Sequence, residues 1–153
     1  MPEIAIAIMS VMPADQGLLP GEYEVIYASD SGGMDKESAF VLKGADAFFR
    51  LWAEVTAGWE TPMPELDPDS FAMVVWFPGE LPTPGYDYQL NNVFLRYRGQ
   101  PDTTLFLVFK LLYRHGAWDG SYIKPVVIVK IRKNISYLPA GWWENCKVEV
   151  KKE

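Results

Sequence analysis

The chain has 153 residues, a net charge of −6 at pH 7 and 49% hydrophobic residues. A chain of this size and hydrophobicity can bury one core without disulfides or metals, so we expect a single domain over residues 1–153. The negative charge repels phosphate backbones, which excludes nucleic acid as an expected partner. Membrane insertion is not expected either, because no apolar run approaches the roughly twenty residues that span a bilayer.

The first half of the chain predicts three strands, at 4–11, 22–28 and 38–42. In the second of these, Tyr23, Val25 and Tyr27 alternate with other residues and are expected on one face of the strand. Residues 29–33 are serine, aspartate and glycine, which favour turns. The second and third strands are therefore expected to pair as a hairpin.

One amphipathic helix is predicted over 45–57, with Gly58 as its stop signal. Four large apolar side chains recur there at helical spacing and should cover a sheet. They are Phe48, Leu51, Trp52 and Val55. The following residues, 59–69, contain three prolines. These exclude continued helix and favour an extended connection.

The second half predicts five further strands, at 72–77, 89–98, 104–113, 122–132 and 146–150. The turn residues of 99–102 favour a hairpin between the second and third of them. Residues 105–113 are apolar on both faces apart from Lys110, so this strand is expected at the centre of a sheet. The predicted fold class is α+β and β-dominated: a mainly antiparallel sheet forming a sandwich or barrel, with one amphipathic helix on an open face.

A stiff loop over 78–86 follows the apolar strand 72–77. Its three prolines fix backbone torsions. Thr83-Pro84-Gly85-Tyr86 has proline and glycine where a type II turn favours them, with a positive φ expected at Gly85. A loop that is shaped in advance loses little conformational freedom on binding, so this segment is suited to recognition of another protein.

Four segments of the chain follow one another in an order found in a known family. They are the helix with Trp52, the strand opening Asp69-Ser70-Phe71, the loop from Gly79 to Thr83-Pro84-Gly85-Tyr86, and the late strand Lys124-Pro125-Val126-Val127-Ile128-Val129-Lys130-Ile131. Over about residues 44–133 the chain resembles the C-terminal domain family named after the protease-complex subunit PrcB. It departs from that family at Pro84 and Val126, where the family has a glycine and an aromatic residue.

The resemblance implies a protease or another protein as partner. The loop is also similar, more distantly, to the binding loop of chagasin-type cysteine-protease inhibitors. We therefore expect a non-catalytic protein-binding module, protease-complex partner or protease-inhibitor-like, acting through the loop 78–86. The expected partner-binding residues are Gly79, Leu81, Pro82, Thr83, Pro84, Gly85, Tyr86 and Tyr88. The two tyrosines are expected either to anchor the partner or to fold back over their own turn.

The sequence offers little chemistry for catalysis. His115 is the only histidine and Cys146 the only cysteine, and no nucleophile motif surrounds a serine or threonine. No enzymatic activity, catalytic residue, cofactor or metal is expected. Glu65, Asp67 and Asp69 place carboxylates at alternate positions, but without the glycine and terminal glutamate of a calcium loop a solvated turn is the preferred interpretation.

Two alternative functions follow from the same sequence. The first is a small apolar-ligand binder, with a pocket between sheet and helix that uses Trp52, Trp76 or Tyr113. The second is a structural domain that self-associates into a homo-oligomer through exposed aromatic residues.

The start of the chain lacks the features of an export signal, which favours a cytoplasmic location. An exported protein would need a leader that has been removed.

Overall fold

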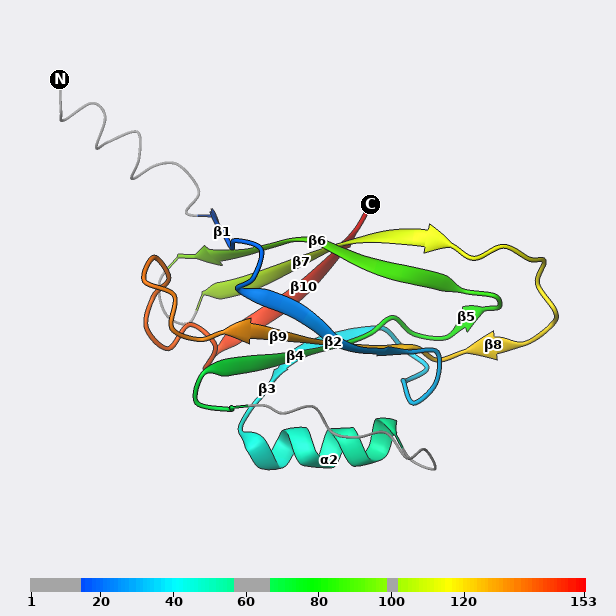
Figure 1. Ribbon diagram of the computed structural model, residues 1–153, viewed down its shortest axis with the longest axis horizontal. Helices are drawn as coiled ribbons and strands as arrows, with labels where there is room; N and C mark the ends of the chain where they lie inside the picture. Colours follow the sequence, from blue (N-terminus) through cyan, green and yellow to red (C-terminus); the bar gives the residue numbers. More distant parts are fainter. Residues whose placement is uncertain (1–14, 57–66, 99–101) are drawn as a thin grey trace, which may run out of the picture.

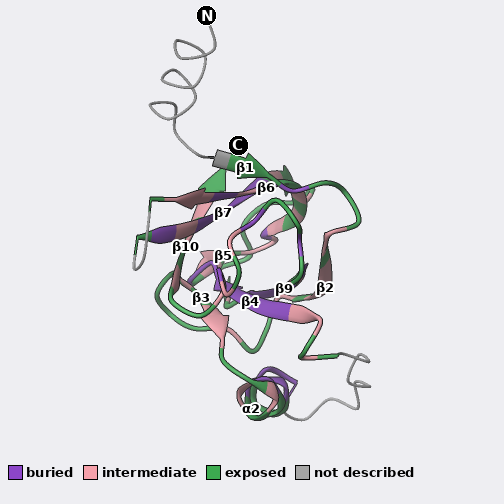
Figure 2. Cartoon of the chain, turned by 90° about the vertical axis from the view of Figure 1, so that its left-hand side faces the viewer, coloured by how far each residue is buried: buried purple, intermediate pink, exposed green. Residues whose placement is uncertain are grey.

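The computed structural model describes residues 15–56, 67–98 and 102–153. Two four-stranded sheets pack face to face as a sandwich, and one helix lies against the outer face of the second sheet (Figure 1). The buried residues lie mainly on the strands of the two facing sheets (Figure 2). The predicted fold class is confirmed as a β-dominated α+β sandwich, and the sheets do not close into a barrel.

The first sheet contains, in spatial order, β1 (Asp15–Gly17), β6 (Tyr86–Tyr97), β7 (Thr103–Tyr113) and β10 (Cys146–Lys152). The second contains β2 (Tyr23–Ser29), β9 (Val126–Arg132), β4 (Phe71–Phe77) and β3 (Ser38–Leu42). Two short strands, β5 (Leu81–Pro82) and β8 (Tyr122–Ile123), pair at one end of the sandwich. All of these ladders are antiparallel except that of β7 with β10, which is parallel.

The central strands of the second sheet are buried on both faces. On β4, Val74 and Trp76 point into the core between the sheets, whereas Met73, Val75 and Phe77 point to the helix. This double burial explains why β4 reads as an uninterrupted apolar run. Between the sheets the ring of Trp76 stacks on that of Phe109 from β7, with 4.8 Å between centroids.

Helix α2 (Ala45–Val55) buries the predicted apolar stripe. All four predicted side chains are less than 9% exposed, and they pack on β4 and β9. The helix begins after Gly44, whose φ is 86°, and at its end the Thr56 hydroxyl donates to the Trp52 carbonyl at 2.5 Å. In the described part of the chain no helix has the length and apolar character needed to cross a bilayer.

The predicted hairpin of β2 with β3 is wrong. The two strands lie at opposite edges of the second sheet, separated by β9 and β4. The more apolar strands, β9 and β4, take the interior positions because both of their faces must be covered. The half-exposed β2 and β3 are left to form the edges.

The predicted shared face of Tyr23, Val25 and Tyr27 is also wrong. Tyr23 and Val25 pack into the core between the sheets, but Tyr27 packs on the helix side, with its ring 4.8 Å from that of Trp52. A bulge between Val25 and Tyr27 inserts one extra residue against β9 and reverses the alternation.

Three further strand predictions are confirmed or adjusted. Strand β7 lies between β6 and β10, in the interior position predicted for it. The predicted strand 122–132 divides into β8 and β9 around Pro125, which has no N–H for a ladder. Strand β6 starts at Tyr86, three residues before the predicted 89.

Three other predictions fall outside the described residues. They concern the strand 4–11, most of the connection 59–69 and the turn residues 99–101.

The core between the sheets provides a direct stability test. Replacing the fully buried Phe109 with alanine should lower the free energy of unfolding by about 3–5 kcal/mol, because it removes a ring that stacks on Trp76 and leaves a cavity. The matched control is Phe49→Ala on the helix surface, where the side chain is 50% exposed and the change should stay within about 0.5 kcal/mol. Urea unfolding followed by tryptophan fluorescence measures both. Equal losses in the two variants would contradict this packing.

Candidate functional site

Three segments far apart in the sequence meet at one end of the sandwich, on the right in Figure 1. They are residues 29–37, 78–88 and 113–124, and together they are called the loop end. The β5–β8 ladder joins the second segment to the third, since Leu81 pairs with Ile123 and Pro82 with Tyr122. The loop predicted to bind a partner is therefore one component of a larger surface.

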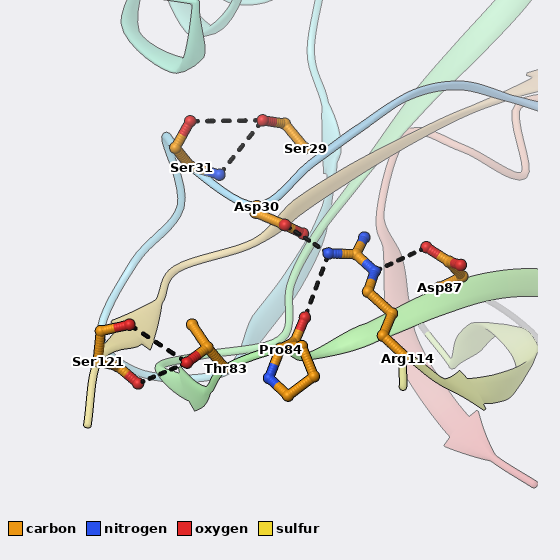
Figure 3. A network of polar contacts seen from close by, with 8 residues as sticks. All are labelled: Ser29, Asp30, Ser31, Thr83, Pro84, Asp87, Arg114 and Ser121. Atoms are coloured by element: carbon orange, nitrogen blue, oxygen red, sulfur yellow. Dashed lines mark hydrogen bonds and ion pairs between the residues drawn. The ribbon is translucent and has the colours of Figure 1, made fainter. Parts of the chain in front are cut away.

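Asp119 holds the proline loop against the segment 113–124. Its Oδ1 accepts from the Thr83 hydroxyl, from the Ser121 hydroxyl at 2.5 Å and from the Ser121 backbone N–H at 2.9 Å. The Thr83 backbone N–H also donates to the Ser121 carbonyl at 3.2 Å, and Figure 3 shows these two residues side by side. The bonds from Ser121 and Thr83 lower the pKa of Asp119 to about 2 because they stabilise the charged carboxylate.

Arg114 ties the two sheets together at the same end. Its Nε lies 2.9 Å from a carboxylate oxygen of Asp87 on β6, and its Nη1 lies 2.5 Å from one of Asp30, just after β2. The same Nη1 donates to the Pro84 carbonyl at 3.3 Å (Figure 3). One guanidinium thus joins β6 of the first sheet, the end of β2 in the second sheet and the proline loop, using the several donors that arginine presents in one plane.

The segment 29–37 is fastened by backbone contacts. Gly33 N–H donates to the Lys124 carbonyl at 2.9 Å, and Glu80 N–H donates to the Asp35 carbonyl at 3.0 Å. The Lys124 ammonium lies 2.5 Å from the Asp35 carboxylate. A β-carbon at Gly33 would lie 2.6 Å from the Lys124 carbonyl oxygen and closer still to that of Pro125. Only glycine fits this position.

The predicted binding residues differ in accessibility. Gly79 and Gly85 are buried, Pro82 is exposed, and the other five, Leu81, Thr83, Pro84, Tyr86 and Tyr88, are half-buried. Gly85 has the positive φ predicted for it, 78°, and the peptide bond between Thr83 and Pro84 is cis. The corner lies against β8 and Arg114 and does not stand free of the sandwich.

The two predicted tyrosines have different environments. Tyr88 turns inward, with its ring 5.2 Å from that of Trp76, and burial raises its pKa to about 12. Tyr86 packs on the ring of Tyr113 at 4.9 Å, beside the turn. Tyr88 therefore contributes to the edge of the core, whereas Tyr86 supports an exposed neighbour.

The most exposed aromatic side chains of the loop end were not among the predicted partner-binding residues, and Tyr113 was expected only as a pocket residue. Tyr113 is 81% exposed, Trp118 58% and Tyr122 55%. Trp118 is fixed by a hydrogen bond from its Nε1 to the Ser121 carbonyl at 2.9 Å, and its ring lies 5.7 Å from that of Tyr122. The available signal was a tryptophan among the turn residues Gly116, Asp119 and Gly120, but nothing local to it indicates a neighbouring proline loop.

The groups considered for catalysis do not meet. Cys146 opens β10 at the end of the sandwich opposite His115, and burial raises the pKa of its thiol to about 12. The described residues include no group of three or more histidine, cysteine, aspartate or glutamate side chains placed to hold a metal ion. Glu65, the first of the three alternating carboxylates, lies outside the described residues.

The aromatic residues considered for an apolar pocket also lie apart. Trp52 packs under the helix, Trp76 lies between the sheets, and Tyr113 is on the surface. These three side chains do not line a common cavity. A cleft of about 280 Å³ does lie at the loop end, and it is lined by Ala28, Ser29, Asp30, Asp87, Tyr88 and Arg114.

Gly33 provides a test of how the loop end is anchored. Gly33→Ala should lower the free energy of unfolding by about 1–3 kcal/mol, because the new methyl group overlaps two backbone carbonyls that cannot move independently of β9. Gly17→Ala is the control, since a β-carbon there meets nothing within 4 Å. Chemical denaturation compares the two variants. A loss at Gly17 as large as that at Gly33 would contradict the close backbone contact.

The pKa of Asp119 predicts a specific response to acid. Because the folded value, about 2, lies below the ordinary 3.8, the stabilisation is complete above about pH 4 and is lost as pH falls towards 2. In Asp119→Asn the melting temperature should therefore fall less between pH 4 and pH 2 than in the wild type. Asp69→Asn, exposed near the start of β4, is the control and should fall as the wild type does. Circular dichroism melts at several pH values measure this, and parallel curves for all three proteins would refute the role of Asp119.

Comparison with protein-family models, with curated proteins and with solved structures gives no match for this chain. The similarity to the PrcB C-terminal domain family stays a prediction that rests on the motif residues. The guide to function is therefore the geometry of the loop end.

Proposed function

We propose that this protein is a non-catalytic protein-binding module that contacts its partner with the loop end. The observation that carries the proposal is the exposure of Tyr113, Trp118 and Tyr122 at 81%, 58% and 55%. Tyrosine and tryptophan combine a large apolar surface with a polar atom, and they are enriched among the residues that dominate binding energy. Because these rings lie together beside a proline-rich loop and are not packed in the hydrophobic core, they support a role in contacting a partner.

The polar framework beneath these rings supports the same proposal. Asp119 fixes the turn that carries Trp118, and Arg114 fixes the strand end that carries Tyr113. Side chains and loops that are ordered before binding lose less entropy when a partner arrives. The loop end is therefore suited to a well-defined partner surface.

A protease or protease complex is the proposed partner class. This part of the proposal rests on the similarity of the proline loop to the PrcB C-terminal domain family and, more distantly, to chagasin-type inhibitors. Pro82 is one of the two exposed residues of that loop, with Glu80, and it is paired directly to Tyr122 through the β5–β8 ladder. The loop and the exposed aromatic residues would thus contact a partner together.

Purified proteases of the serine, cysteine and metallo classes test the proposal by surface plasmon resonance and by inhibition. Trp118→Ala should weaken binding about 30-fold, the loss typical of a central aromatic contact of about 2 kcal/mol. Tyr113→Ala and Tyr86→Ala should weaken it as well. Phe49→Ala, an equally exposed aromatic residue on α2, is the matched control and should bind as the wild type does.

Equal binding by all four variants would remove the loop end from the interaction. If the wild-type protein binds none of the proteases, a protease is not its partner. Sedimentation of the wild type and Trp118→Ala at several concentrations separates self-association from partner binding. A dimer that dissociates in Trp118→Ala would favour the homo-oligomer over the proposed function.

A further inference from the structure

The loop end carries an excess of negative charge. Its segments contain six carboxylates and three lysine or arginine side chains, which accounts for half of the net charge of −6. Two of the three cations are already paired within the molecule, Arg114 with Asp30 and Asp87, and Lys124 with Asp35, and Lys152 of β10 pairs with a fourth carboxylate, Glu37. A partner that approaches this end therefore meets a negative surface.

Asp119 is the carboxylate most clearly prepared for an external cation. The three hydrogen bonds that it accepts from Thr83 and Ser121 come from neutral donors and reach Oδ1. Among the described residues none of these bonds reaches Oδ2, and no lysine or arginine forms an ion pair with this carboxylate. The negative charge of Asp119 is held in place but is not neutralised.

The rings beside Asp119 lack the cationic cover that rings elsewhere in the molecule possess. Lys133 lies 5.0 Å from the centroid of Trp143, Arg96 lies 4.9 Å from that of Phe106, and Lys130 lies 4.7 Å from that of Phe71. Within the described ranges no lysine or arginine is placed over Trp118 or Tyr122. Trp118 and Tyr122 thus share with the exposed Tyr113 and Phe49 a ring face over which no lysine or arginine of the described residues lies.

A carboxylate beside exposed aromatic faces is suited to a guanidinium or ammonium group. The carboxylate provides a charge-assisted hydrogen bond, and a tryptophan or tyrosine face attracts a cation placed over it. We propose that the loop end selects a protein partner that presents a basic side chain, above all arginine, to Asp119 and to the rings of Trp118 and Tyr122. Arginine fits best because its planar group can stack on a ring and donate to a carboxylate at the same time. This inference rests on the proposed function and specifies the chemistry of the partner surface.

A pair of synthetic peptides tests the inference on the full chain. The probe is a decapeptide of alternating arginine and glycine; its control has citrulline, which is neutral and similar in shape, at each arginine. In heteronuclear NMR titrations the arginine peptide should shift the Trp118 indole N–H and the amides of 119–122, and the citrulline peptide should bind at least threefold more weakly. Asp119→Asn should weaken arginine-peptide binding about three- to fivefold, the range of one exposed ion pair. Asp69→Asn changes the net charge equally and should leave the affinity unchanged.

Equal weakening by Asp119→Asn and Asp69→Asn would show that net charge alone attracts the peptide, and this would overturn the inference. Shifts confined to residues outside the loop end, or equal binding of the citrulline peptide, would overturn it too. The protease measurements decide the proposed function separately. If Trp118→Ala loses the protease while the peptide does not distinguish the two aspartates, protein binding stands without a basic partner. If Asp119→Asn selectively weakens peptide binding but no protease binds, the site for a basic side chain is supported and the protease partner is not.

Discussion

The double burial of β4 and β9 is the constraint on which the rest of the structure depends. Val74 and Val129 face the first sheet, while Val75 and Ile128 face the helix. Strands as apolar as these two are stable in water only if both of their faces are covered. This requirement places the helix on one side, the first sheet on the other, and the more polar β2 and β3 at the edges.

The same arrangement brings the three segments of the loop end together. The connections that follow β2, β4 and β7 all leave the sandwich at one end, although they are widely separated along the chain. Polar contacts then give that end its shape: Arg114 joins the two sheets, and Asp119 joins the proline loop to the segment 113–124. Arg114 and Asp119 hold the loop end together, and the aromatic side chains of Tyr113, Trp118 and Tyr122 lie at its surface.

Local patterns identified the elements well but not their neighbours. The stripe of α2 and the interior position of β7 were predictable, because periodicity and two-sided apolarity report directly on burial. The positive φ of Gly85 followed from turn chemistry. The separation of β2 from β3 and the inward turn of Tyr88 were not predictable, because they depend on which strand is buried more deeply. Trp118 was missed because the turn that carries it is held by Thr83, more than thirty residues away in the sequence.

The pairing of β2 with β9 affects how the chain can fold. Tyr23 pairs with Ile131, and Leu105 pairs with Val148, so neither sheet can be completed until segments distant in the sequence have found each other. Contacts of this kind must overcome the entropy of closing long loops, and folds that depend on them form slowly. During synthesis the apolar strands β4 and β7 emerge from the ribosome before β9 and β10. Until then each of them has an open edge, and an open apolar edge is the place where association with other chains begins.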